Sequence, residues 1–199
     1  GNFVIGDNAF KDCVGITSFD FSKVKSIASY AFQNTGLRSV DLTGVATIKA
    51  SAFRDSASLS SFTGIKDIPA STFVNCGFET LDLNNVVKIG SSAFSSNHRL
   101  TSVSINDNED VSQNSNKVSV ESSAFANCEN LETVTIGKGV TAIKAGAFLN
   151  DVKITLIDLP DTITEIGANA FKGTSLTTVK LPSGLTKLDT TSFACGTLT

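Results

Sequence analysis

One short motif recurs along the whole chain: a Phe preceded by Ala, Thr or Ser. It occurs nine times, at Phe10, Phe32, Phe53, Phe73, Phe94, Phe125, Phe148, Phe171 and Phe193. Successive copies are 20–23 residues apart, except for one step of 31. A unit of this length cannot bury its own apolar side, so the copies must stack on one another. The repeat therefore predicts a solenoid of about nine right-handed coils.

Each repeat unit carries two shorter apolar patterns besides the Phe. The first alternates apolar and polar residues, as in Val134–Ile136, and predicts a short half-buried strand. The second places two aliphatic residues three apart, as in Val140 and Ile143, and predicts a second short strand. The segment around the Phe, for example 124–128, is too short for a stable helix and predicts a single helical or 3₁₀ turn. Stacked copies would pair their strands in a parallel ladder on one face.

The composition fits a repeat and excludes several other classes of protein. The chain of 199 residues has 14 Phe, one Tyr and no Trp, and nine of the Phe occupy the motif position. This predicts a core of nine stacked rings. The formal net charge is −3 and the basic residues are spread through the chain, so no nucleic-acid-binding surface is expected. No run of 18 apolar residues occurs, so no membrane insertion is expected either.

The single long step between motifs contains an insertion, 106–117, with the sequence NDNEDVSQNSNK. Its polar composition predicts a loop that projects from one coil. The spacing of Asn106, Asn108 and Asp110 is that of the residues that open a calcium-binding loop. Val111 stands where such a loop needs Gly, however, and Lys117 stands where it needs an acidic residue. A plain polar loop is therefore favoured over a cation site, and no metal site is expected.

The residues that most often carry chemistry are few and scattered. Cys13, Cys76 and Cys128 each follow a motif Phe by three residues, and Cys195 follows one by two. Equivalent positions in separate coils lie too far apart for a disulfide, and no C-x-x-C pair occurs, so buried thiols are favoured over a metal or redox site. The only histidine, His98, lies in a polar corner without a nucleophile beside it. We expect neither enzymatic activity nor a cofactor.

The outward-pointing residues of the first strand form the candidate binding face. Because side chains alternate along a strand, the residue between the two buried positions faces outward in every coil. This column reads Asp20, Asp41, Thr63, Asp82, Ser104, Thr135, Asp158 and Lys180. The column beside it reads Ser18, Ser39, Ser61, Thr80, Ser102, Thr133, Leu156 and Thr178. Two interpretations remain open: a soluble sheet face without a ligand, or a broad and weak binding face.

The repeat resembles the BspA-like class of leucine-rich repeat, which occurs in surface and secreted proteins of bacteria and of some parasitic protists. The consensus I-G-x-x-A-F-x-x-C-x-x-L-x-x-V-x-I-P is matched best by the copy over 166–185. The resemblance covers the whole chain and implies a leucine-rich repeat solenoid, an α/β fold dominated by strands. The insertion 106–117 and a shortened repeat around 62–65 depart from the pattern. The absence of Met and the start at Gly1 lead us to expect one repeat domain, 1–199, cut from a longer protein.

The resemblance also implies a function, since members of this class are similar to adhesins. The expected role is a non-catalytic, adhesin-like module, extracellular or on the cell surface. Its partner would be a protein or glycan on host cells, in the matrix or on other microbes, and the module is expected to be a monomer. The alternative is a structural spacer that holds another part of a surface protein away from the cell and has no ligand of its own.

Overall fold

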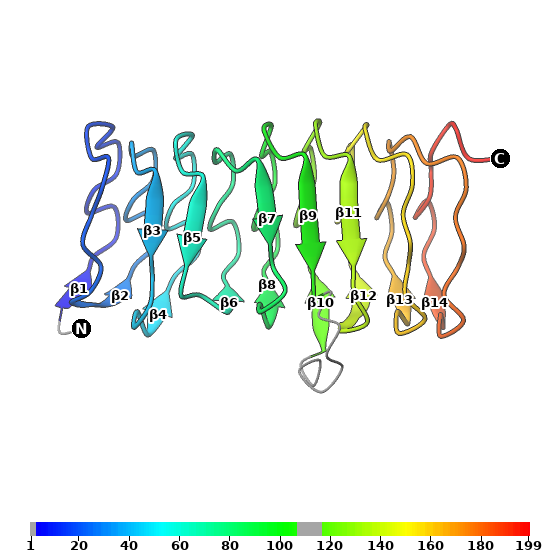
Figure 1. Ribbon diagram of the computed structural model, residues 1–199, viewed down its shortest axis with the longest axis horizontal. Coiled ribbons are helices and arrows are strands. Elements are labelled where there is room, and N and C mark those ends of the chain that lie inside the picture. The colour runs from blue at the N-terminus through cyan, green and yellow to red at the C-terminus, as the bar shows by residue number, and fades with distance from the viewer. Residues whose placement is uncertain (1–2, 107–116) are drawn as a thin grey trace.

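The computed structural model describes residues 3–106 and 117–199, and these form 14 short strands on two sides of a stack of coils (Figure 1). On the first side, which we call the strand face, lie β3 (Ser39–Asp41), β5 (Ser61–Thr63), β7 (Thr80–Asp82), β9 (Ser102–Ile105) and β11 (Thr133–Ile136). On the other side, the second-strand side, lie β1 (Phe3–Ile5), β2 (Val24–Ile27), β4 (Thr47–Ile48), β6 (Asp67–Ile68), β8 (Lys88–Ile89), β10 (Val118–Val120), β12 (Val140–Ile143), β13 (Glu165–Ile166) and β14 (Lys187–Leu188).

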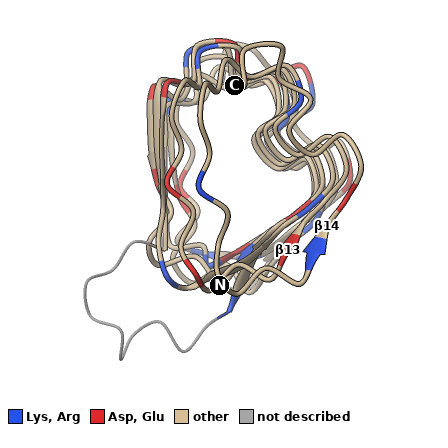
Figure 2. Cartoon of the chain, turned by 90° about the vertical axis from the view of Figure 1, so that its right-hand side faces the viewer, with Lys and Arg blue, Asp and Glu red and all other residues tan. Residues whose placement is uncertain are grey.

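All strand pairs are parallel, and their registers are regular except for one shift each in the pairs β1-β2 and β10-β12. On the strand face the order is β3-β5 in one sheet and β11-β9-β7 in another, with Thr135 opposite Ser104 and Val134 opposite Val103. On the second-strand side a three-stranded sheet, β1-β2-β4, is followed by a six-stranded sheet, β14-β13-β12-β10-β8-β6. Viewed along the stack, successive coils superpose closely (Figure 2). The predicted parallel solenoid is therefore confirmed.

The coil count is slightly lower than predicted. Within residues 3–106 and 117–199, nine Phe-bearing turns and nine second strands alternate with eight strand-face segments, so the chain completes about eight coils rather than nine. The predicted insertion 106–117 and its cation spacing lie outside the described residues, apart from Asn106 and Lys117 at its ends. No helix in the described part of the chain has the length and apolar character that crossing a membrane requires.

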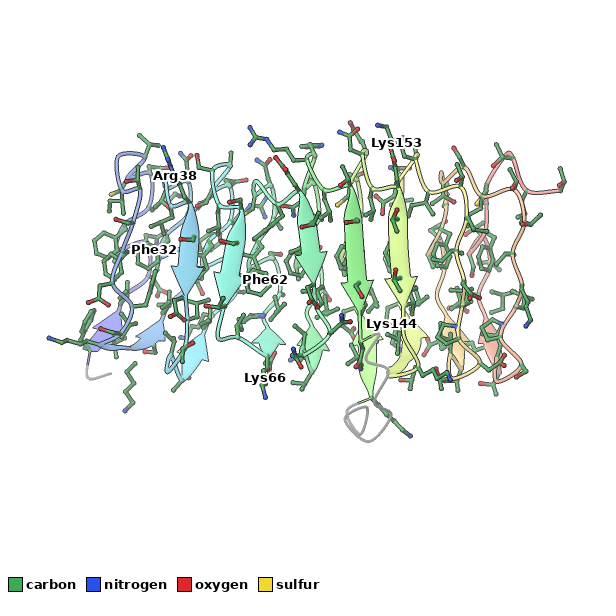
Figure 3. The ribbon with its side chains drawn as sticks, in the orientation of Figure 1. Phe32, Arg38, Phe62, Lys66, Lys144 and Lys153 are labelled. Carbon is green, nitrogen blue, oxygen red and sulfur yellow. The ribbon has the colours of Figure 1, made fainter. Side chains whose placement is uncertain are left out.

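The nine motif Phe rings stack along the length of the molecule, as predicted. Ring centroids of successive coils are 5.0 Å apart for Phe10 and Phe32, 5.4 Å apart for Phe125 and Phe148, and no two neighbours are more than 5.8 Å apart. The rings of the seven central coils are fully buried. Phe78 packs edge-on against this column, with its ring at 89° to that of Phe73. Figure 3 labels Phe32 within the stack and Phe62 behind the strand face.

The segment around each motif Phe is a turn of a different kind from the single helical or 3₁₀ turn that the sequence predicts. In most coils the residues two before and two after the Phe have positive φ, for example Ser123 (58°) and Asn127 (63°) around Phe125. These left-handed residues point alternate N–H groups toward the next coil, so Phe125 N donates to the carbonyl oxygen of Ala147 at 2.9 Å. A helical turn would keep these donors within its own coil. The turn therefore lengthens the ladder between coils.

The strand face loses its ladder in the last two coils. Residues 155–159 and 177–181 have the predicted alternating pattern but form no strand, and no backbone hydrogen bond joins 155–159 to β11. Between β9 and β11 the ladder closes with Gly137 N donating to Ile105 O at 2.9 Å. The residues equivalent to Gly137 are Pro160 and Pro182, and proline has no N–H to donate. The two prolines thus account for the missing closing bonds.

Candidate binding face

The structure places the eight predicted candidate residues in one column on the strand face. All eight are at least partly exposed, and all but the half-buried Ser104 are fully exposed. The ladder sets Asp41 opposite Thr63 and Ser104 between Asp82 and Thr135. Asp20, Asp158 and Lys180 belong to coils whose strand-face segments form no strand, so the ladder does not fix their neighbours. The eight candidate residues of this column are Asp20, Asp41, Thr63, Asp82, Ser104, Thr135, Asp158 and Lys180.

Three of the acidic residues in this column stabilise turns. The Oδ1 atoms of Asp20, Asp41 and Asp82 each accept a hydrogen bond from the backbone N–H two residues further on, at 2.9–3.0 Å. This is the Asx turn that short acidic side chains favour. The bonds that Asp41 accepts, from Thr43 and from the Thr63 hydroxyl, lower the pKa of its carboxyl. The signal was present in the sequence as Asp followed two residues later by Ser, Thr or Asn.

Asp158 and Lys180 differ from these three, because a proline stands two residues after each of them. Pro160 cannot donate an N–H to the Asp158 carboxylate, so the turn that holds the other aspartates cannot form there. No hydrogen bond or ion pair engages Asp158 or Lys180 in the described chain, although Asp161 accepts one from Ser183 N at 2.7 Å. The charged groups of Asp158 and Lys180 are therefore available to a ligand.

Open hollows lie where neighbouring strand-face segments are not hydrogen-bonded. One of about 230 Å³ lies between β5 and β7, beside Phe62 and Phe78. Two more adjoin each other beyond β11, with volumes of about 350 Å³ and 530 Å³, and they share Ile136 and Asp158. We call these two together the strand-face groove. Its lining residues are 132–138, Leu156–Thr162 and Lys180.

The strand-face groove contains the one apolar residue of the flanking column. Leu156 is 70% exposed, whereas the equivalent residue in every other coil is Ser or Thr. Leu156 lines the smaller hollow together with Glu132 and Asp158, and the larger hollow adds Lys138, Asp161 and Lys180. The groove combines an exposed aliphatic side chain with unpaired charges, an arrangement suited to holding another molecule by non-covalent contacts.

Neither the histidine nor any of the cysteines lines the strand-face groove. His98 is exposed in its corner, as predicted. All four cysteines are free thiols, and the prediction of buried thiols is confirmed for Cys76 and Cys128, whereas Cys13 and Cys195 are half-buried. Burial raises the pKa of the Cys128 thiol well above its usual range, which keeps it protonated and unreactive.

The second-strand side carries an ionic cluster that the repeat pattern did not indicate. The Glu165 carboxylate of β13 pairs with Lys144 from the preceding coil and with Lys187 of β14 at 3.0 Å, and Lys187 also pairs with Asp189 at 3.2 Å. The hydrogen bonds from Lys144 and Lys187 lower the pKa of Glu165. Figure 3 shows Lys66 and Lys144 along this side, and Arg38 and Lys153 at the opposite corner. These pairs join neighbouring coils and leave no site between them.

Comparison with known proteins places the chain in a family of repeats. It matches the model of the BspA-type leucine-rich repeat region, with six copies, over residues 25–118 and 118–199. No curated protein sequence matches it significantly.

Solved structures share the fold at low sequence identity. A leucine-rich cell surface protein from Faecalibacterium prausnitzii is 21% identical, with a TM-score of 0.64, and the alignment covers 98% of this chain and 56% of that one. The pneumococcal vaccine antigen PcpA is 20% identical, with a TM-score of 0.53, and the alignment covers 90% and 54% of the two chains. This chain thus spans little more than half the length of either protein. The family model covers residues 25–199, which is most of the chain: the chain belongs to the BspA-type leucine-rich repeat family.

Proposed function

We propose that this repeat stack is a non-catalytic interaction module of a cell-surface or secreted protein, and that its strand-face groove binds a protein partner. The partner would be displayed by host cells, the matrix or other microbes, and the module would act as a monomer. The observation that carries the proposal is Leu156, an exposed aliphatic side chain in a column that is otherwise Ser and Thr, set in a groove with unpaired charges. A related solved structure is described as a cell surface protein, which supports this location.

A protein partner fits the groove better than a glycan does. Sugar-binding sites commonly stack rings of the ligand on aromatic side chains, and no aromatic residue lines the strand-face groove. An aliphatic anchor flanked by lysines and aspartates instead matches a peptide segment with one apolar side chain and charged neighbours. The groove is small, so we expect modest affinity for a single copy and stronger attachment where several copies act together.

A matched pair of variants tests this assignment. Leu156→Ser removes the exposed leucine from the groove, and Val152→Ser removes another exposed aliphatic side chain, 48% exposed, from the same coil outside the groove. The purified protein would be applied to arrays of matrix proteins, epithelial surface proteins and glycans. We expect protein binding that Leu156→Ser weakens about tenfold and Val152→Ser leaves unchanged. Binding to glycans alone, or equal losses in both variants, would contradict the proposal.

The spacer is the second candidate, and one observation favours it. Asp20, Asp41 and Asp82 are engaged in turns, so much of the strand face offers a ligand only small hydroxyl groups. A spacer predicts no binding on any array, and it predicts that shortening the stack changes the reach of the full-length protein without changing what it binds.

A further inference from the structure

The third residue after each motif Phe forms a buried polar column behind the Phe stack. In several coils its side chain donates a hydrogen bond to the carbonyl oxygen of the motif Phe in the preceding coil. Ser56 donates to Phe32 O at 3.0 Å, and the thiol of Cys128 donates to Phe94 O at 3.3 Å. Cys76 does the same toward Phe53, and in the last coil Cys195, the second residue after its Phe, does so toward Phe171. This position therefore calls for a hydrogen-bond donor.

Asn97 shows how a two-ended side chain fills the position. Its Oδ1 accepts a hydrogen bond from Cys76 N at 3.2 Å, and its Nδ2 donates to Phe73 O at 2.9 Å and to Phe94 O at 2.7 Å. One end thus caps an N–H of the preceding coil, and the other end satisfies two carbonyl oxygens. Asn97 is completely buried, so water cannot replace these bonds.

Asp151 occupies the same position two coils later, and only one of its ends has a partner. Its Oδ1 accepts a hydrogen bond from Cys128 N at 2.8 Å, as Asn97 Oδ1 does from Cys76 N. Its Oδ2, the counterpart of the donating Nδ2 of Asn97, is buried without a hydrogen-bond partner. An ionised carboxylate has no hydrogen to donate, and a buried charge without a counter-ion is costly.

We propose that Asp151 is a protonation-dependent latch: it is the neutral acid in the folded protein, and its Oδ2–H donates to the carbonyl oxygen of Phe125. Loss of that proton removes the donor and leaves a buried negative charge between the turns of Phe125 and Phe148. The junction of these two coils is then weaker in alkaline than in mildly acidic solution. This inference does not depend on the proposed function.

The surroundings of Asp151 support a neutral acid. Its side chain is completely buried, and this burial raises the pKa of the Asp151 carboxyl to about 8, with only the bond from Cys128 N acting in the other direction. The titratable group that faces it is the Cys128 thiol, which is protonated as well. The equivalent residue of the following coil, Thr174, is uncharged, and Lys153 is directed to solvent, where it pairs with Glu132 at 3.5 Å.

The direction of the pH effect follows from the raised pKa. In the unfolded chain the carboxyl titrates near its ordinary value of 3.8, and in the folded protein it titrates at about 8. Folding therefore takes up a proton between these values. The stabilisation is complete below the lower value, declines as the pH rises toward the upper value, and is constant above it. The strand-face side of this junction has no backbone bonds to β11, so the junction is held by the β10-β12 pair and by the hydrogen bonds of the Phe125 turn, next to which Asp151 lies.

The test compares Asp151→Asn with two other variants. Asp158→Asn removes an exposed carboxyl from the same coil, and Asn97→Asp places a carboxyl at the equivalent buried position of another coil. Urea midpoints would be measured between about pH 5 and about pH 9. We expect the wild-type urea midpoint to fall as the pH rises toward 8. The midpoint of Asp151→Asn should not show this fall, whereas that of Asp158→Asn should show it unchanged. The midpoint of Asn97→Asp should fall more steeply than that of the wild type.

A second measurement covers the case in which a variant does not fold. Carbon NMR of wild-type protein labelled at the aspartate carboxyls should show one group that titrates near pH 8. A spectrum in which every aspartate titrates below about pH 5 would overturn the proposal. So would a variant Asp151→Asn whose midpoint depends on pH as the wild type does.

Discussion

The two sides of each coil hold the stack together in different ways. On the Phe side, every motif Phe from Phe10 to Phe171 donates its backbone N–H to a carbonyl oxygen of the next coil, at 2.8–3.1 Å, without a break. On the strand face, the ladder is interrupted between β5 and β7 and ends at β11. The Phe side also buries a ring and a hydrogen-bonding side chain in each of the seven central coils, whereas the strand face presents its outward column to solvent.

The two sides of each repeat therefore differ in role: the Phe side holds neighbouring coils together, and the strand face carries the candidate binding residues. The Phe side tolerates little change, because its residues must fit the ring column, the left-handed turn positions and the buried donor column together. The strand face needs only its inward apolar residues, so its outward residues can vary from coil to coil. The strand-face groove lies where two prolines and Leu156 interrupt the regular pattern.

The largest effect is expected from truncating a ring in the middle of the Phe side. Phe125→Ala removes a fully buried side chain whose ring stacks on Phe94 at 5.5 Å and on Phe148 at 5.4 Å. A cavity of this kind costs about 3–5 kcal/mol in free energy of unfolding. Phe193→Ala, in the last turn, removes a half-buried ring with one stacking partner and should cost less than half as much. Urea unfolding of both variants measures the difference, and equal losses would argue against a stack that is strongest at its centre.

A smaller effect is expected from the buried donor column. Asn97→Ala leaves Cys76 N–H and Phe73 O without these partners and leaves Phe94 O with only the weak bond from the Cys128 thiol, so the free energy of unfolding should fall by about 3 kcal/mol. Asn130→Ala is the matched control, because its amide also bonds a backbone carbonyl, that of His98, but at an exposed site. Water can replace that bond, so a change within about 0.5 kcal/mol is expected. Thermal or urea unfolding that ranks the two variants the other way would refute a role for the buried column.

The smallest effect is expected on the strand face. Hydrogen bonds from Thr43 and Thr63 lower the pKa of Asp41, so its ionised form stabilises the fold above the ordinary value of 3.8 and this contribution is lost as the pH falls through the folded value. Asp41→Asn keeps an oxygen that can accept from Thr43 but has no charge to lose. Its urea midpoint should lie slightly below that of the wild type near neutral pH and meet it in acid. A constant offset at all pH values would show that charge has no part in this turn.

Much of the architecture was predictable from the repeat. The spacing of the Phe and of the aliphatic residues five positions before it identified the coils, because one slot in a solenoid core accepts one kind of side chain. The turn around the Phe was predicted incorrectly. The residue type at a position such as Ser123 does not reveal a left-handed backbone, and the backbone conformation decides where the N–H group points. Alternation along the strand predicted the outward column, and the ladder aligns Asp41 with Thr63 and Ser104 with Asp82 and Thr135, whereas binding by this column stays a prediction. In this column Asp20, Asp41 and Asp82 accept a hydrogen bond from the N–H two residues later, whereas Asp158 does not because that residue is Pro160. The list of column residues alone did not reveal this difference.

The sequence by itself determined the repeat, the parallel stack and the ring column, since these follow from which positions must be apolar at a fixed period. Only the tertiary structure decided how the coils are joined. The N–H groups that join the coils have partners one coil away, about 22 residues along the chain. Whether Asp151 finds a donor or an acceptor, and whether Leu156 meets a neighbouring strand or an open groove, depends on the coil packed beside it rather than on its own repeat.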